Sequence, residues 1–195
     1  MSSCMKVTRR TVMTAAVAGI AALTGLPALP VAANGTTPAE QAAHVAANRF
    51  LELVRNGGSR DSFADLLGRH VSVQQIAMFA LGKYRRAMPP KQRQTYVNLV
   101  NDMLLDTVTK HGKQVRGRAF VVTGSRGNIV KGYIQHASGK QTAVDLRMVK
   151  DRVADVRVQG IWMGFMLRQE FNRVIDSKGG DVTAIFAYLK SGAAQ

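Results

Sequence analysis

The spacing of apolar residues changes twice along this chain, and these changes restrict its fold more than any other feature of the sequence. From Pro38 to about Lys110, apolar residues recur every three or four positions, which is typical of helices that bury one face. Four runs rich in β-branched residues follow and predict strands over Ala119–Thr123, Ile129–Gln135, Gln141–Lys150 and Val153–Gln159. Helical spacing returns from about Trp162. This order predicts an α+β fold: an antiparallel, strongly curved sheet of about four strands with helices packed on one face, enclosing an apolar cavity.

Residues 1–33 have the composition of an export signal. Arg9 and Arg10 precede a mildly apolar run, Ala15–Leu29, and small residues near Ala33 supply a cleavage site of the A-x-A type. Paired arginines at this position are typical of the twin-arginine export route. We therefore expect cleavage near Ala33, a single domain over residues 34–195 and a periplasmic location. The alternative, a membrane anchor, fits less well because Thr, Gly and Pro residues interrupt a run that is short for a span of roughly 20 residues.

The chain is strongly basic, with 27 Lys and Arg residues against 12 Asp and Glu residues and a formal net charge of +15. Such an excess is typical of proteins that bind nucleic acid or an anionic membrane surface. We expect a membrane surface and no nucleic acid, because an exported protein meets none. A basic surface that only keeps the protein soluble is the alternative. The single cysteine, Cys4, lies in the predicted signal, so we expect no disulfide in the mature domain.

The sequence contains no motif for a metal site, a cofactor or a nucleophile, and we expect no cofactor, no metal and no catalysis. The four histidines lie far apart without H-E-x-x-H spacing, and glycine-rich phosphate loops are absent. The alternative is a pocket enzyme of acid–base type that uses Asp145 or Asp155 as a buried carboxylate. A competing interpretation makes these two residues either surface residues of their strands or partners of Arg147 and Arg157.

Several segments, taken together and in order, resemble one protein family. They are Phe79-Ala80-Leu81-Gly82-Lys83-Tyr84-Arg85-Arg86, Gln92-Arg93-x-x-Tyr96, Asp145-Leu146-Arg147-Met148-Val149-Lys150, Asp155-Val156-Arg157-Val158-Gln159-Gly160-Ile161, Arg168 with Phe171, and Gly180-Asp181. Over roughly Pro38 to Leu189, this ordered set resembles the MlaC, or toluene-tolerance, family of periplasmic phospholipid-binding transport proteins. No segment is specific alone, so the order and spacing carry the resemblance.

The resemblance implies a soluble periplasmic carrier that shelters phospholipid acyl chains and shuttles lipid between outer- and inner-membrane complexes, maintaining outer-membrane lipid asymmetry. The implied partners are an inner-membrane ABC-type lipid transporter, an outer-membrane lipid complex and, transiently, an anionic membrane surface. Two departures from the family pattern leave a hopanoid or another apolar lipid as an alternative ligand. The segment Lys150–Ala154 lacks a glycine turn and a tryptophan, and Trp162 stands where a serine is common. An adaptor that binds transport proteins without carrying lipid is a further alternative.

A carrier of this kind has to hide hydrocarbon from water. Sheltering about 30 methylene groups at about 0.8 kcal/mol each requires an enclosed slot rather than a shallow groove. We expect one wall from the long helix, one from the sheet and the ends from neighbouring residues. The predicted tail contacts are Tyr84, Val97, Val100, Leu104, Val108, Val144, Leu146, Met148, Val156, Val158, Trp162, Phe165 and Met166. The predicted headgroup or membrane contacts are Lys83, Arg85 and Arg86. The alternatives are plain core packing for the apolar residues and a solvated helix end for the basic ones.

Overall fold

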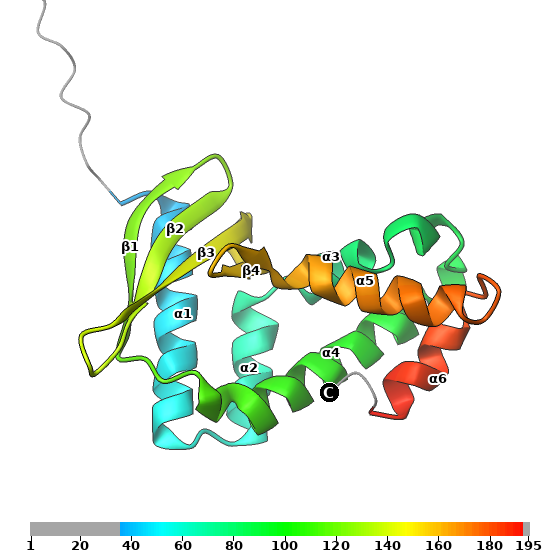
Figure 1. The fold of residues 1–195 in the computed structure, drawn as a ribbon, viewed down its shortest axis with the longest axis horizontal. Helices are drawn as coiled ribbons and strands as arrows, with labels where there is room; N and C mark the ends of the chain where they lie inside the picture. The colour runs from blue at the N-terminus through cyan, green and yellow to red at the C-terminus, as the bar shows by residue number, and fades with distance from the viewer. Residues whose placement is uncertain (1–35, 193–195) are drawn as a thin grey trace, which may run out of the picture. The chain divides into compact units, whose positions relative to one another are not determined.

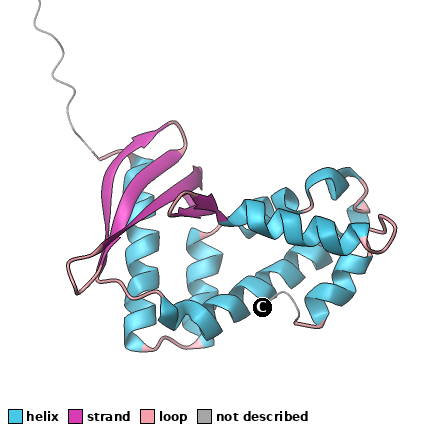
Figure 2. Cartoon of the chain, in the orientation of Figure 1, coloured by secondary structure: helices cyan, strands magenta, loops and turns pink. Residues whose placement is uncertain are grey.

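The computed structural model describes residues 36–192 (Figure 1), so the predicted export signal with Arg9 and Arg10 lies outside the described residues. The helices of this part are α1 (Pro38–Asn56), α2 (Arg60–His70), α3 (Val73–Ala80), α4 (Arg93–His111), α5 (Met163–Asp176) and α6 (Ala184–Lys190). Short 3₁₀ helices are η1 (Gly82–Arg86), η2 (Pro90–Gln92) and η3 (Gly112–Gln114). The strands are β1 (Ala119–Arg126), β2 (Ile129–Gln135), β3 (Gln141–Val149), β4 (Arg152–Val158) and β5 (Ile161–Trp162). Helices, then strands, then helices confirm the predicted α+β class (Figure 2).

The strands form one open antiparallel sheet in the order β1-β2-β3-β4-β5. The two-residue strand β5 adds a fifth strand to the predicted set of about four. It pairs with the end of β4 through a tight turn in which Gln159 (φ 49°) and Gly160 (φ 89°) both have left-handed backbone conformations. Positive φ at both central residues is the geometry of the turns that join twisted antiparallel strands.

Helix α1 covers the apolar face of the sheet. Its first turn contains Pro38 and a capping box, in which Thr37 Oγ1 accepts a hydrogen bond from the backbone N–H of Glu40 at 3.2 Å and Glu40 Oε2 accepts one from the backbone N–H of Thr37 at 2.8 Å. Apolar residues of α1 and of the strands then pack together. This sheet core contains the buried residues Ala43, Ala46, Leu51, Phe120, Val130, Val144, Leu146, Met148 and Val153.

Helices α3, α4, α5 and α6 form a second core. This helical core contains the buried residues Ala77, Ala80, Leu81, Met88, Tyr96, Val100, Met103, Phe171, Ile175, Val182, Ile185 and Leu189. Tyr96 is fully buried, and its hydroxyl donates to the backbone carbonyl of Ala77 at 2.9 Å. Its ring also contacts those of Phe171 and Phe186 edge-on, with centroids 6.4 Å apart in both pairs. Burial raises the pKa of the Tyr96 hydroxyl well above its ordinary value, so the group stays a neutral donor.

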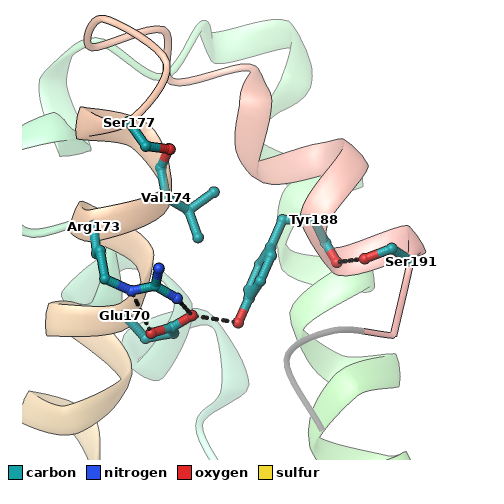
Figure 3. Close-up of polar contacts among 6 residues, drawn as sticks. All are labelled: Glu170, Arg173, Val174, Ser177, Tyr188 and Ser191. Atoms are coloured by element: carbon teal, nitrogen blue, oxygen red, sulfur yellow. Dashed lines mark hydrogen bonds and ion pairs between the residues drawn. The ribbon is translucent and has the colours of Figure 1, made fainter.

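A polar contact joins α5 to α6 (Figure 3). Tyr188 of α6 donates its hydroxyl hydrogen to Glu170 Oε1 of α5 at 2.7 Å, and Arg173 donates to the same carboxylate from one turn further along α5. Burial, with the hydrogen bond to Glu170, raises the pKa of Tyr188 to about 12, whereas the Arg173 hydrogen bond lowers the pKa of Glu170. The carboxylate therefore stays ionised and holds the last helix in place.

A third, smaller core lies where α1, α2 and α4 meet, with Leu53, Phe63, Leu66, Leu67 and Leu105 buried in it. Helix α2 begins after Ser59, whose Oγ accepts from the backbone N–H of Ser62 at 3.2 Å, and this contact caps the helix. Across residues 36–192, no helix has both the length and the apolar content that crossing a membrane requires.

Candidate functional site

All five residues that were predicted to contact lipid tails from the sheet share one of its faces. Leu146 lies opposite Val156 and Val144 lies opposite Val158 in the register, and Met148 continues the same alternation along β3. The three residues of β3 are buried in the sheet core, and the two valines of β4 are half-buried at its edge. This face packs against α1.

The predicted helix wall packs elsewhere. Val97 and Val100 of α4 belong to the helical core, and Val108 belongs to the third core. Leu104 packs against both. Helix α4 packs against α2, α3 and α6, and its apolar stripe is buried between these helices. The structure therefore does not bring the predicted helix wall and the predicted sheet wall together.

Two pockets of the described residues are notable, and neither is the enclosed apolar cavity that the sequence predicts. One, of about 10 Å³, lies between α1, α2 and α4 and has room for a single water molecule. The other, of about 340 Å³, is open rather than enclosed, and is lined by Gln92, Thr95, Thr183, Phe186 and Lys190. Neither predicted wall borders such a cavity, because the sheet wall packs against α1 and the helix wall packs against other helices.

Exposed apolar side chains gather at the corner between β5 and α5. In the described residues, four of the five exposed large apolar side chains come from this segment: Ile161 (54 % exposed), Met163 (40 %), Phe165 (51 %) and Met166 (52 %). Together with the half-buried Trp162, which lies on the other face of β5 from Ile161, we call these residues the corner patch. Isolated exposed apolar residues are ordinary in soluble proteins, whereas a group of five from six consecutive residues indicates a contact surface.

Trp162 contacts two arginines, one from β3 and one from β4. The guanidinium carbons of Arg147 and Arg157 lie 4.2 Å and 4.9 Å from the centre of a Trp162 ring. Each contact has the distance of a favourable cation–π interaction. The pair holds the indole in a defined position on the face of the sheet that is opposite to α1, because Trp162 pairs with Arg157 in the register.

The buried carboxylate of Asp155 joins the sheet to the start of α5. Its Oδ1 accepts hydrogen bonds from the backbone N–H groups of Gly164 and Val156, both at 2.8 Å, and its Oδ2 lies 3.4 Å from the Arg147 guanidinium. Asp155 thus caps α5 from another strand and places a negative charge at the positive end of the helix.

A β-bulge gives Asp155 this orientation. Arg147 pairs with Asp155, whereas Met148 pairs with Val153, so Ala154 is left without a partner in the ladder. The extra residue turns Val153 into the sheet core and Asp155 to the opposite face, although simple alternation would place both on one face.

Asp145 forms an ion pair with Arg157, in which Arg157 Nε donates at 2.7 Å, and Asp155 pairs with Arg147. The structure confirms the interpretation that made these carboxylates partners of the two arginines. Both carboxylates are engaged by donors, so neither is placed as a free base. In residues 36–192, no group of three His, Cys, Asp or Glu side chains is arranged to hold a metal ion.

Tyr84 of η1 lies beside the end of α5, whereas the corner patch lies at its start. Its hydroxyl donates to Asp176 at the end of α5, and Lys83 Nζ lies 2.9 Å from the same carboxylate. The Tyr84 hydrogen bond and then Lys83 hold the pKa of Asp176 below its ordinary value. Arg85 and Arg86 are exposed on η1. The structure therefore separates Tyr84 and the basic cluster from Trp162, Phe165 and Met166, which it brings together.

Sequence reasoning missed Ile161 and Met163 of the corner patch, and it did not identify Arg147 and Arg157 as the residues that hold Trp162. The density of apolar residues after Gly160 could have indicated this patch, but the same density is also typical of the start of a buried helix.

Comparisons with known proteins agree with this fold. Residues 39–191 match the family model described as MlaC protein. Among solved structures, the phospholipid-binding protein from Ralstonia solanacearum, determined in complex with a phospholipid, superimposes with a TM-score of 0.66 at 19 % sequence identity. The match covers 80 % of this chain and 97 % of that chain, and it shows that the two share a fold. Comparison with curated proteins gives no match.

Proposed function

The chain belongs to the MlaC protein family, and from this premise we propose that it is a lipid carrier that binds a phospholipid and holds its acyl chains away from water. The family match spans almost the whole described fold, and this observation carries the proposal. The Ralstonia solanacearum protein that shares the fold was determined with a phospholipid bound, which supports the same ligand class here.

An apolar row leads from the protein surface into the sheet core and gives acyl chains an entry. In the register, exposed Ile161 lies beside half-buried Val158, which lies beside buried Val144. Neighbours in one row share a face of the sheet, so the three side chains form a continuous apolar track. The sheet core has to open along this track when lipid enters. The helical core is a separate cluster and stays packed.

Lipid extraction tests the proposal directly. We expect organic extracts of the protein, purified from its native periplasm, to contain about one lipid per chain by mass spectrometry. The lipid identified distinguishes a phospholipid from a hopanoid. Protein that carries no lipid, and takes none from vesicles, contradicts the carrier and favours the adaptor, a second candidate that the closely packed interior supports.

A pair of substitutions locates the acyl chains. Val158→Phe adds bulk on the apolar track, whereas Val121→Phe adds the same bulk at a half-buried valine on the opposite face of β1. We expect Val158→Phe to lower the lipid content several-fold and Val121→Phe to leave it unchanged, with both proteins folded by circular dichroism. Equal lipid content in the two variants places the chains elsewhere.

We also propose that the protein works in the periplasm, between an outer-membrane lipid complex and an inner-membrane ABC-type transporter, and is not an enzyme. Arg9 and Arg10 support export through the twin-arginine route. Replacing both with lysine is expected to retain the protein in the cytoplasm, as cell fractionation and immunoblotting measure. Unchanged periplasmic protein contradicts this route.

A further inference from the structure

The corner patch is a contact surface that the interior of the protein does not use. Ile161 of β5 and Phe165 and Met166 of α5 each leave about half of their surface in solvent, whereas Phe171 and Ile175 further along α5 are buried. Side chains of this size gain most from leaving water when they meet an apolar phase. The patch is therefore available to a partner.

The charge around the corner patch indicates the chemistry of that partner. From Val156 to Gln169 the chain contains Arg157 and Arg168 and no acidic residue, and Arg157 is paired with Asp145 of β3. Arg168 has no carboxylate partner among the described residues, and its guanidinium lies over the Phe79 ring, 3.6 Å from the ring centre. Exposed apolar side chains beside an arginine that has no carboxylate partner, on a chain with a formal net charge of +15, match the surface of an anionic bilayer, where the apolar groups enter the acyl region and the arginine meets phosphates.

We propose that the corner patch docks the protein on the surface of an anionic lipid bilayer, with Phe165 and Met166 inserted below the headgroups and Trp162 at headgroup depth. The indole suits this depth because one edge is polar and the ring is apolar. The inference deepens the proposed function and rests on it in one respect, since the complexes with which the proposed carrier exchanges lipid lie in bilayers. It assigns the contact to the corner patch rather than to Lys83, Arg85 and Arg86.

Trp162 is the only tryptophan of the chain, so its fluorescence reports on the corner patch alone. The full protein is mixed with vesicles of equal parts phosphatidylcholine and phosphatidylglycerol whose acyl chains carry bromine, a contact quencher. We expect quenching and a blue shift of Trp162, together with co-flotation of protein and vesicles. Binding without quenching assigns the contact to another surface and overturns the proposal. Absence of binding also overturns it and leaves a protein partner for the patch.

A matched pair of variants tests which side chains insert. Phe165→Ser with Met166→Ser removes two exposed apolar groups of the corner patch, whereas Val45→Ser removes an apolar group of α1 that is 46 % exposed. We expect the double variant to bind vesicles at least about tenfold more weakly, and Val45→Ser to bind like the wild type. Equal binding by all three proteins contradicts the inference.

The lipid content of the same samples distinguishes failure of the docking proposal from failure of the carrier proposal. A double variant that still contains lipid after purification but no longer floats with vesicles supports docking by the corner patch. A wild-type protein that floats and is quenched but never contains lipid retains the docking surface and contradicts the carrier.

Discussion

Replacing Gly164 with alanine tests the contact that joins the sheet to α5. An ideal Cβ at this position would lie 2.8 Å from Asp155 Oδ2, 3.0 Å from Cγ and 3.1 Å from Oδ1; the first distance is shorter than real Cβ contacts, and the other two are tighter than most. Asp155 is only 5 % exposed, and its Oδ1 already accepts two backbone hydrogen bonds, so the carboxylate cannot move away without breaking one. Losing one hydrogen bond to a charged acceptor costs about 1.5–3 kcal/mol.

The preference of a helix for alanine over glycine offsets about 0.5–1 kcal/mol of this loss. We therefore expect Gly164→Ala to lower the free energy of unfolding by about 1–2 kcal/mol. Urea unfolding followed by far-ultraviolet circular dichroism measures the change. Gly68→Ala in α2 is the control, because Gly68 is exposed and no atom lies within 4 Å of its added Cβ. We expect that control to raise stability by about 0.5–1 kcal/mol. A Gly164→Ala protein as stable as the control refutes the reasoning.

Three further substitutions test the helical part of the protein by urea unfolding. Gly82→Ala puts a Cβ 2.8 Å from Asn172 Nδ2 at a left-handed φ of 55°, so we expect a loss of about 1–3 kcal/mol, and an unchanged midpoint contradicts this. Tyr96→Phe removes a buried hydrogen bond to a carbonyl of α3 and should cost about 0.5–1.5 kcal/mol; a neutral result shows that the hydroxyl is dispensable. Tyr84→Phe should lower the midpoint at pH 7. The Tyr84 hydrogen bond lowers the pKa of Asp176 in the folded protein, so it stabilises the protein fully at pH values above the unfolded pKa of about 3.8. The difference in unfolding midpoint between variant and wild type should therefore shrink as the pH falls below about 3.8. A difference that is independent of pH excludes Asp176 as the cause.

Much of the fold can be predicted from the sequence because an element that buries one face has apolar residues at a regular spacing. The alternation in β3 predicts which of its residues face α1 and which face away, and the register then sets Asp145 opposite Arg157. The short strand β5 shows no such spacing. Two residues are too few for a period, and the turn before it uses Gln159 rather than the asparagine or aspartate that favours this conformation.

The candidate site was less predictable, because periodicity indicates that a side chain is buried but not what buries it. The apolar stripe of α4 is real, yet it packs between helices rather than across a slot from the sheet. The bulge at Ala154 is a second example. One unpaired residue places Val153 and Asp155 on opposite faces of the sheet, and no residue type in this segment marks it in advance.

The cap on α5 links the two proposals. When lipid enters along the track from Ile161 to Val158, the sheet core has to open, but Asp155 keeps the first turn of α5 bonded to β4 through Gly164. Met163, Phe165 and Met166 of the corner patch belong to this same turn. If both proposals hold, the entry for acyl chains and the contact with the bilayer stay together while the core opens. A carrier whose docking surface moved away from its entry would instead expose the acyl chains to water during transfer.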